Sequence, residues 1–94
     1  MLSKAPIDLN KVPKENIDKE ILRWGIIAEL DAINIYEQFA AKSNNKKIKE
    51  ILLDIAKEEK THMGEFQALL LELDKEQVQE LESGKKEVEG MTKK

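Results

Sequence analysis

The chain has 94 residues, which is room for one small domain whose hydrophobic core is marginal in a monomer. Sixteen Lys and Arg residues against nineteen Asp and Glu residues give a net charge of −3, which argues against a nucleic-acid partner. Because the chain contains no cysteine, it cannot build disulfides, zinc knuckles or iron–sulfur clusters. No apolar run reaches the ~18–20 residues of a membrane span, so we expect a soluble cytoplasmic protein.

Two long amphipathic helices are predicted after an N-terminal arm over residues 1–13, in which Pro6 and Pro13 disfavour regular structure. Apolar residues recur at helical spacing from about residue 14 to about residue 42, and again from about residue 46 to residue 73. Ser43-Asn44-Asn45 interrupts the pattern. Ser and Asn compete for backbone hydrogen bonds, so this stretch predicts a turn.

A short third helix is predicted to follow Asp74, which can cap it together with Gln77. We expect this helix to end near Ser83-Gly84, with Gly84 as its C-cap. Residues 85–94 are then predicted to be a flexible tail or linker. The helical domain proper would cover residues 14–84.

The predicted fold is therefore all-α: an antiparallel two-helix hairpin with a short C-terminal helix. A hairpin of two helices has too little interior to bury the apolar stripes of both. We expect the hairpin to pair with a second copy of itself, because a symmetric dimer would form a four-helix bundle.

Two glutamates and the only histidine stand inside the apolar stripes. The helical neighbours of Glu29 are apolar or small, and Gly25 leaves a gap one turn before it. Glu59 and His62 are adjacent on the second helix, also among apolar residues. Burying an unpaired carboxylate costs several kcal/mol, so these residues need compensation. A metal ion would supply it, because it pairs with both carboxylates and with the imidazole.

The spacing of these residues matches half of a di-iron carboxylate site. In such bundles two helices each contribute a Glu, and two others each contribute Glu-x-x-His. One chain here supplies Glu29 and the segment Glu59-Lys60-Thr61-His62, and a two-fold axis would supply the other half. Glu29 lies fifteen residues before Asn44 and Glu59 lies fifteen after it, so both should be at the same height in the hairpin.

Other interpretations of the individual residues stay open. A Glu-x-x-His pattern arises by chance in Glu-rich helices, and Glu29 or His62 alone could belong to a polar subunit interface. Tyr36 could donate a hydrogen bond to a ligand carboxylate or could be part of the core. Glu58 and Glu65 flank His62 on its helix and are either outer metal ligands or surface residues.

Residues 27–38, followed at the matching separation by Glu58-Glu59-Lys60-Thr61-His62, resemble the encapsulated ferritins, the ferritin-like proteins housed in encapsulin nanocompartments. The resemblance runs from about residue 21 to residue 81, and it is greatest to the form fused N-terminally to a shell protein. It implies a half-ferritin hairpin that dimerises into a ferritin-like four-helix bundle. It also implies a decameric ring of five dimers inside an encapsulin shell.

Some residue roles are implied by this resemblance. The iron ligands of the ferroxidase centre fall on Glu29, Glu59 and His62. A tyrosine near the centre falls on Tyr36, and an acidic position on the route of incoming iron falls on Asp31. On that route, this chain has Ala28 where other members carry a further glutamate.

The functional hypothesis is a ferroxidase that oxidises Fe(II) to Fe(III) with O₂ at a di-iron centre between two subunits. The iron would then be mineralised inside the encapsulin compartment, and calcium or other divalent ions are candidates for outer sites. Two alternatives stay open. The same site could serve a rubrerythrin-like scavenger of peroxide or oxygen, or the chain could be a non-enzymatic helical assembly domain.

Overall fold

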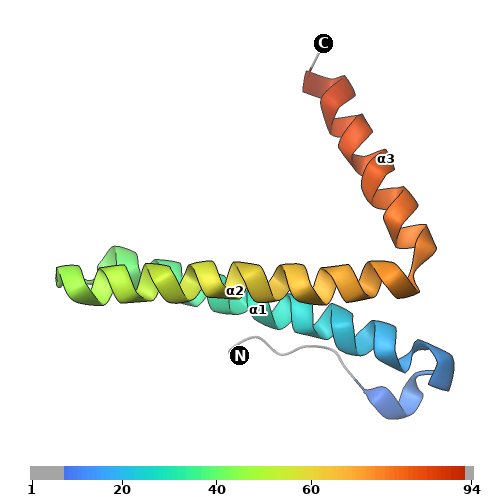
Figure 1. Ribbon diagram of the computed structural model, residues 1–94, viewed down its shortest axis with the longest axis horizontal. Coiled ribbons are helices and arrows are strands. Elements are labelled where there is room, and N and C mark those ends of the chain that lie inside the picture. The colour runs from blue at the N-terminus through green and yellow to red at the C-terminus, as the bar shows by residue number, and fades with distance from the viewer. Residues whose placement is uncertain (1–7, 93–94) are drawn as a thin grey trace.

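The fold is an antiparallel helical hairpin followed by a third helix. The computed structural model describes residues 8–92, and two 3-10 helices, Leu9–Lys11 and Lys14–Asn16, precede the first α-helix. Helix α1 spans Ile17–Lys42 and helix α2 spans Lys46–Leu73, and the two lie side by side (Figure 1). The predicted all-α class and the two long helices are confirmed.

The turn between α1 and α2 falls at Ser43-Asn44-Asn45, as predicted. The Ser43 hydroxyl oxygen accepts a hydrogen bond from the Asn45 N–H at 3.1 Å, which orders the connection. The Asn45 side chain then accepts from the Ile48 N–H at 3.1 Å and caps α2. These bonds satisfy groups that a helix end otherwise leaves without a partner, so the chain reverses direction within three residues.

The interface between α1 and α2 is narrow. Four apolar side chains are buried among the described residues: Ile33, Ala40, Ala56 and Leu70. Fourteen large hydrophobic residues in the same part of the chain are exposed, and nine of them, including Phe39 at 55%, lie on α1 and α2. Apolar surface left open on this scale is typical of an interaction face. The single hairpin thus leaves room for the predicted second copy, and the four-helix bundle stays a prediction.

Asp74 forms the corner between α2 and α3, which spans Lys75–Thr92. Its N–H donates to the Leu70 carbonyl at 2.9 Å and closes α2, while its Oδ1 accepts from the Gln77 N–H at 3.0 Å and caps α3. Its Oδ2 pairs with the Arg23 Nη2 of α1 at 2.9 Å. The Gln77 N–H, helped by Arg23, holds the pKa of Asp74 below its usual value. The predicted Asp74–Gln77 cap is confirmed.

The third helix is longer than predicted. The prediction of a short helix ending near Ser83-Gly84 is wrong, because α3 continues to Thr92 and Gly84 does not take the left-handed C-cap conformation. Residues 85–92 of the predicted flexible tail are therefore helical, and Lys93-Lys94 lie outside the described residues. Lysine and glutamate are good helix formers, and each of the two interior glycines, Gly84 and Gly90, costs only about 1 kcal/mol.

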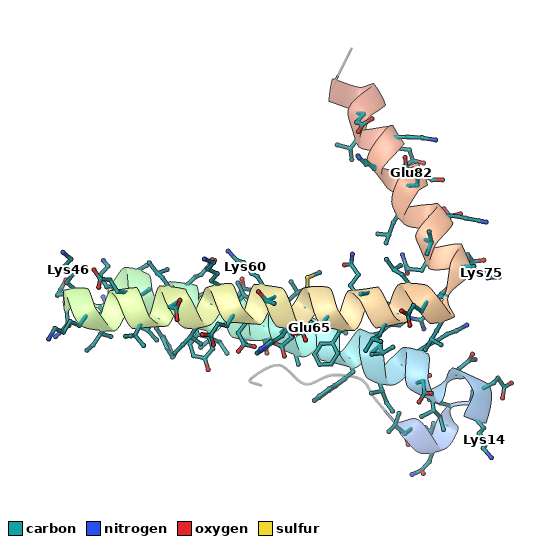
Figure 2. The ribbon with its side chains drawn as sticks, in the orientation of Figure 1. Lys14, Lys46, Lys60, Glu65, Lys75 and Glu82 are labelled. Carbon is teal, nitrogen blue, oxygen red and sulfur yellow. The ribbon has the colours of Figure 1, made fainter. Side chains whose placement is uncertain are left out.

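Helix α3 points away from the hairpin (Figure 1). All side chains at positions 78–91 are exposed, and Figure 2 shows Lys75 and Glu82 projecting from it into open space. At the other end of the chain, residues 1–7 of the predicted arm lie outside the described residues, and Asp8 caps the 3-10 helix Leu9–Lys11. No helix within residues 8–92 is long and apolar enough to cross a membrane.

Candidate metal centre

The hairpin brings Glu29 of α1 together with Glu59 and His62 of α2. Each residue offers one ligand atom, and the three atoms lie within 4.8 Å of one another. The His62 Nδ1 is 3.7 Å from the Glu29 Oε2 and 3.6 Å from the Glu59 Oε2. Two carboxylates and an imidazole nitrogen therefore converge on one point between the two helices.

Local helix geometry accounts for this convergence. Glu59 and His62 are three residues apart, so they lie on the same face of α2 about one turn from each other. The position of the turn at Ser43-Asn44-Asn45 places Glu29 across from them on α1. The predicted equal height of the two glutamates agrees with the short distances to His62.

The burial of the three side chains differs in a way that suits a cation. Glu29 and Glu59 are largely buried, at 16% and 19% exposure, whereas His62 is 48% exposed. The Glu29 Oε2 is a buried atom with no hydrogen-bond partner. A buried anionic oxygen without a partner is costly, and a metal ion would satisfy it. The exposed side of His62 leaves the cluster accessible from outside the hairpin.

The donor set also has dimensions that a metal ion can span. Ligand atoms bonded at ~2.0–2.2 Å to one ion lie at most about 4.4 Å apart. The two His62–glutamate separations, 3.6 and 3.7 Å, fall inside this limit, and all three ligand atoms lie within 4.8 Å of one another. Carboxylate oxygens and imidazole nitrogen together suit iron, zinc and manganese. The cluster therefore fits the predicted metal.

The other candidate residues lie outside this cluster. Asp31 and Tyr36 are half-buried on α1, and Tyr36 lies two turns along the same face from Glu29. Glu58 and Glu65 are exposed on α2. The structure assigns no ligand role to these four residues, and the roles suggested for them above stay predictions.

Three features of the site region were not predicted in full from the sequence. Gly25 packs directly against the ring of Phe66, and only the gap at Gly25 had been noted. Lys60, between Glu59 and His62 on α2, forms an ion pair with Glu37 of α1 at 3.1 Å. The indole Nε1 of Trp24 is buried without a hydrogen-bond partner. None of these three features follows from helical periodicity, because each depends on how α1 and α2 approach each other.

Comparison with known proteins gives a consistent set of relatives. The chain matches the rubrerythrin family over residues 20–93. It is 55% identical to the ferritin-like–encapsulin shell fusion protein of Pyrococcus furiosus, in an alignment that covers 98% of this chain and 27% of that protein. It is 39% identical to the encapsulin nanocompartment cargo protein EncC of Myxococcus xanthus, over 70% of this chain and 53% of that protein. The chain thus spans about a quarter and about half of the length of these two relatives.

A solved structure has the same fold. The crystal structure of the encapsulated ferritin domain from Pyrococcus furiosus aligns with a TM-score of 0.85 and 52% identity. The alignment covers 100% of this chain and 98% of that chain. The similarity therefore includes α3 as well as the hairpin.

Proposed function

Because the chain belongs to the rubrerythrin family, as an encapsulin-associated ferritin-like domain, we propose that it is a ferroxidase. It oxidises Fe(II) to Fe(III) with O₂ at a di-iron centre that two copies of the chain share. The observation that carries this proposal is the cluster of Glu29, Glu59 and His62, whose ligand atoms lie within 4.8 Å of one another.

Iron is the substrate, and the three residues bind and orient it. The carboxylates of Glu29 and Glu59 neutralise the charge of the bound cations, and the His62 imidazole supplies the nitrogen ligand. The reaction balances when two Fe(II) ions each lose one electron and one O₂ takes up both electrons and two protons to give hydrogen peroxide. Holding both ions in one site lets O₂ receive two electrons in one encounter.

The site is completed by a second copy of the hairpin. One chain provides two carboxylates and one histidine, and di-iron bundles of this type use four carboxylates and two histidines. The exposed apolar residues of α1 and α2 support this arrangement, because a second hairpin would cover them. We propose a homodimer, five of which form a decameric ring.

We propose that the protein lies inside an encapsulin compartment in the cytoplasm, where its Fe(III) product is mineralised. Two relatives carry encapsulin in their names, one as a shell fusion and one as a cargo protein, which supports this location. The half-buried Asp31 is proposed to lie on the route of incoming iron, and Tyr36 and the exposed Glu58 to assist near the centre. Calcium or other divalent ions are proposed for outer sites of the assembly.

The direct test is iron oxidation. The protein is mixed with Fe(II) without oxygen, air is admitted, and the absorbance of Fe(III) is followed. We expect Glu29→Ala and His62→Ala to lose the protein-dependent rate, and Glu50→Ala, an exposed residue on α2, to retain it. If the two site variants oxidise iron as fast as the unaltered protein, the assignment is wrong. Elemental analysis together with native mass spectrometry would report the metal content and the number of subunits.

A second candidate is reduction of peroxide at the same cluster, which the match to the rubrerythrin family favours. This activity needs electrons from outside, whereas the ferroxidase needs only Fe(II) and O₂. Supplying NADH with a reductase and following peroxide loss therefore separates the two. We expect peroxide consumption in that assay to be slow compared with the oxidation of added Fe(II). The opposite order would favour the peroxide reductase.

A further inference from the structure

Gly25 allows an unusually close contact between α1 and α2. A Cβ atom added at position 25 would lie 3.1 Å from Cδ2 of Phe66 and 3.2 Å from two other atoms of its ring. Carbon atoms in good contact are about 3.5–4.0 Å apart. The ring of Phe66 would therefore have to move by a few tenths of an ångström to admit any other residue at position 25. Gly25 itself is buried.

This contact lies one turn from the metal cluster on both helices. Gly25 is four residues before Glu29 on α1, and Phe66 is four residues after His62 on α2. Residues four apart share a helical face and are only about 6 Å apart along the axis. Because a helix is stiff over one turn, the separation of α1 and α2 at Gly25 also sets their separation at the cluster.

We propose that Gly25 is a positioning residue that fixes the distance between α1 and α2 at the cluster and thereby sets which size of divalent ion the cluster prefers. The inference rests on the proposed metal-binding role of Glu29, Glu59 and His62. Protein–metal bonds tolerate changes of only about 0.2 Å. A methyl group at position 25 must move Phe66 from 3.1 Å to at least 3.4 Å, so the helices open by more than this tolerance unless the ring turns aside.

The expected effect is a change in selectivity, beyond any general loss of affinity. Opening the hairpin moves Glu29 away from Glu59 and His62, which penalises a small ion such as Zn²⁺ more than the larger Mn²⁺. We expect Gly25→Ala to weaken Zn²⁺ binding about tenfold, in the range seen when the support of metal ligands is altered. Binding of Mn²⁺ should change less than about threefold, so the ratio of the two dissociation constants should shift toward Mn²⁺.

Gly64 offers a matched control. It also lies inside a long helix, two residues after His62, and a Cβ added there meets nothing within 4 Å. Gly64→Ala gives the same gain in helix propensity as Gly25→Ala without the contact to Phe66. We expect it to keep the Zn²⁺/Mn²⁺ ratio of the unaltered protein. The double variant Gly25→Ala with Phe66→Leu should restore this ratio, because the smaller side chain makes room for the methyl group.

The experiment measures the dissociation constants for Zn²⁺ and Mn²⁺ by competition with a chelator, on assembled protein and with no turnover. An unchanged ratio in Gly25→Ala, or the same shift in Gly64→Ala, would overturn the inference. If Gly25→Ala does not fold, the double variant decides, and a ratio that differs from that of the unaltered protein counts against the proposal. If the unaltered protein binds neither ion at the cluster, the proposed metal site itself fails. If it binds both ions and Gly25→Ala leaves their ratio unchanged, only the role of Gly25 fails, so the two failures are distinguishable.

Discussion

Replacing Glu29 by glutamine should have opposite effects on stability with and without metal. The Oε2 of Glu29 is buried and has no hydrogen-bond partner, and the nearest cationic candidate, the His62 Nδ1, is 3.7 Å away. A buried polar group without a partner costs about 1–3 kcal/mol, and a charged group costs more. Glutamine has the same shape and no charge. Metal-free Glu29→Gln should therefore be more stable than the unaltered protein by at least about 1 kcal/mol.

Metal should reverse this order. A ligand present at 100 times its dissociation constant stabilises the folded state by about 2.7 kcal/mol, and Glu29→Gln should bind metal too weakly to gain this amount. The unaltered protein should then become more stable than the variant by somewhat more than 1 kcal/mol. For a domain of this size, 1 kcal/mol corresponds to about 4–8 °C in melting temperature, so both differences are measurable.

The assay is thermal unfolding of both proteins with a chelator and with saturating Mn²⁺, which avoids the redox chemistry of iron. Glu50→Gln, at an exposed position on α2, is the matched control and should follow the unaltered protein in both conditions. The reasoning is refuted if metal-free Glu29→Gln is less stable than the unaltered protein while its stabilisation by Mn²⁺ is intact. That result would make Glu29 a structural hydrogen-bond acceptor.

Three further predictions concern the hairpin and its corner. The pKa of Asp74 is lowered in the folded chain, chiefly by the hydrogen bond from the Gln77 N–H. The contribution of the Asp74 carboxylate to the stability of the fold is therefore complete above its unfolded pKa near 3.8, and it is lost as the pH falls through the lowered folded-state pKa. Far-UV circular dichroism from about pH 6 to about pH 2 should therefore show less acid-induced loss of helix in Asp74→Asn, which keeps a neutral acceptor. Asn45→Ala removes the cap of α2 and should lower the free energy of unfolding, measured with urea, by about 0.5–2 kcal/mol. An unchanged free energy of unfolding would mean that water replaces the hydrogen bond from the Ile48 N–H. Ala56 is only 2% exposed between the two long helices, so Ala56→Leu should force them apart and lower the free energy of unfolding by about 1–3 kcal/mol. An unchanged free energy of unfolding in the same urea assay would contradict tight packing at this position.

The sequence predicts the hairpin well because its signals are local and strong. Both long helices have apolar residues at helical spacing, and Ser43-Asn44-Asn45 contains the side chains that cap and turn the chain. The cluster could be predicted for a related reason. In an antiparallel hairpin, the position of the turn fixes which residues face each other, so counting from Asn44 placed Glu29 across from Glu59.

The end of α3 could not be predicted in the same way. A glycine can end a helix or lie within it, and the choice at Gly84 depends on a balance of about 1 kcal/mol. The polar composition after Gly84 is typical of a flexible tail, although lysine and glutamate favour a helix almost as much as alanine does. With its side chains at positions 78–91 exposed, α3 also lacks the buried stripe that marks α1 and α2.

The contact between Gly25 and Phe66 lies between these two cases. The sequence shows a gap beside Glu29, but the residue that fills it comes from the other helix, and its identity depends on the distance between the helices to within a few tenths of an ångström. Periodicity gives the face on which a residue lies, and it does not give this distance. The properties of the site that depend most on distance, above all the proposed preference for one ion over another, therefore cannot be predicted from the sequence and require the three-dimensional structure.

The proposed pairing of two hairpins around one metal centre would have a thermodynamic consequence. If each copy contributes Glu29, Glu59 and His62 to one centre, metal binding and dimerisation are linked, and each must strengthen the other by the same factor. A hairpin with four buried apolar side chains has little stability to spare, so the metal would contribute to the stability of the assembly as well as being its substrate. In the proposed ferroxidase, oxidation would raise the charge of the bound iron and would thereby change this coupling.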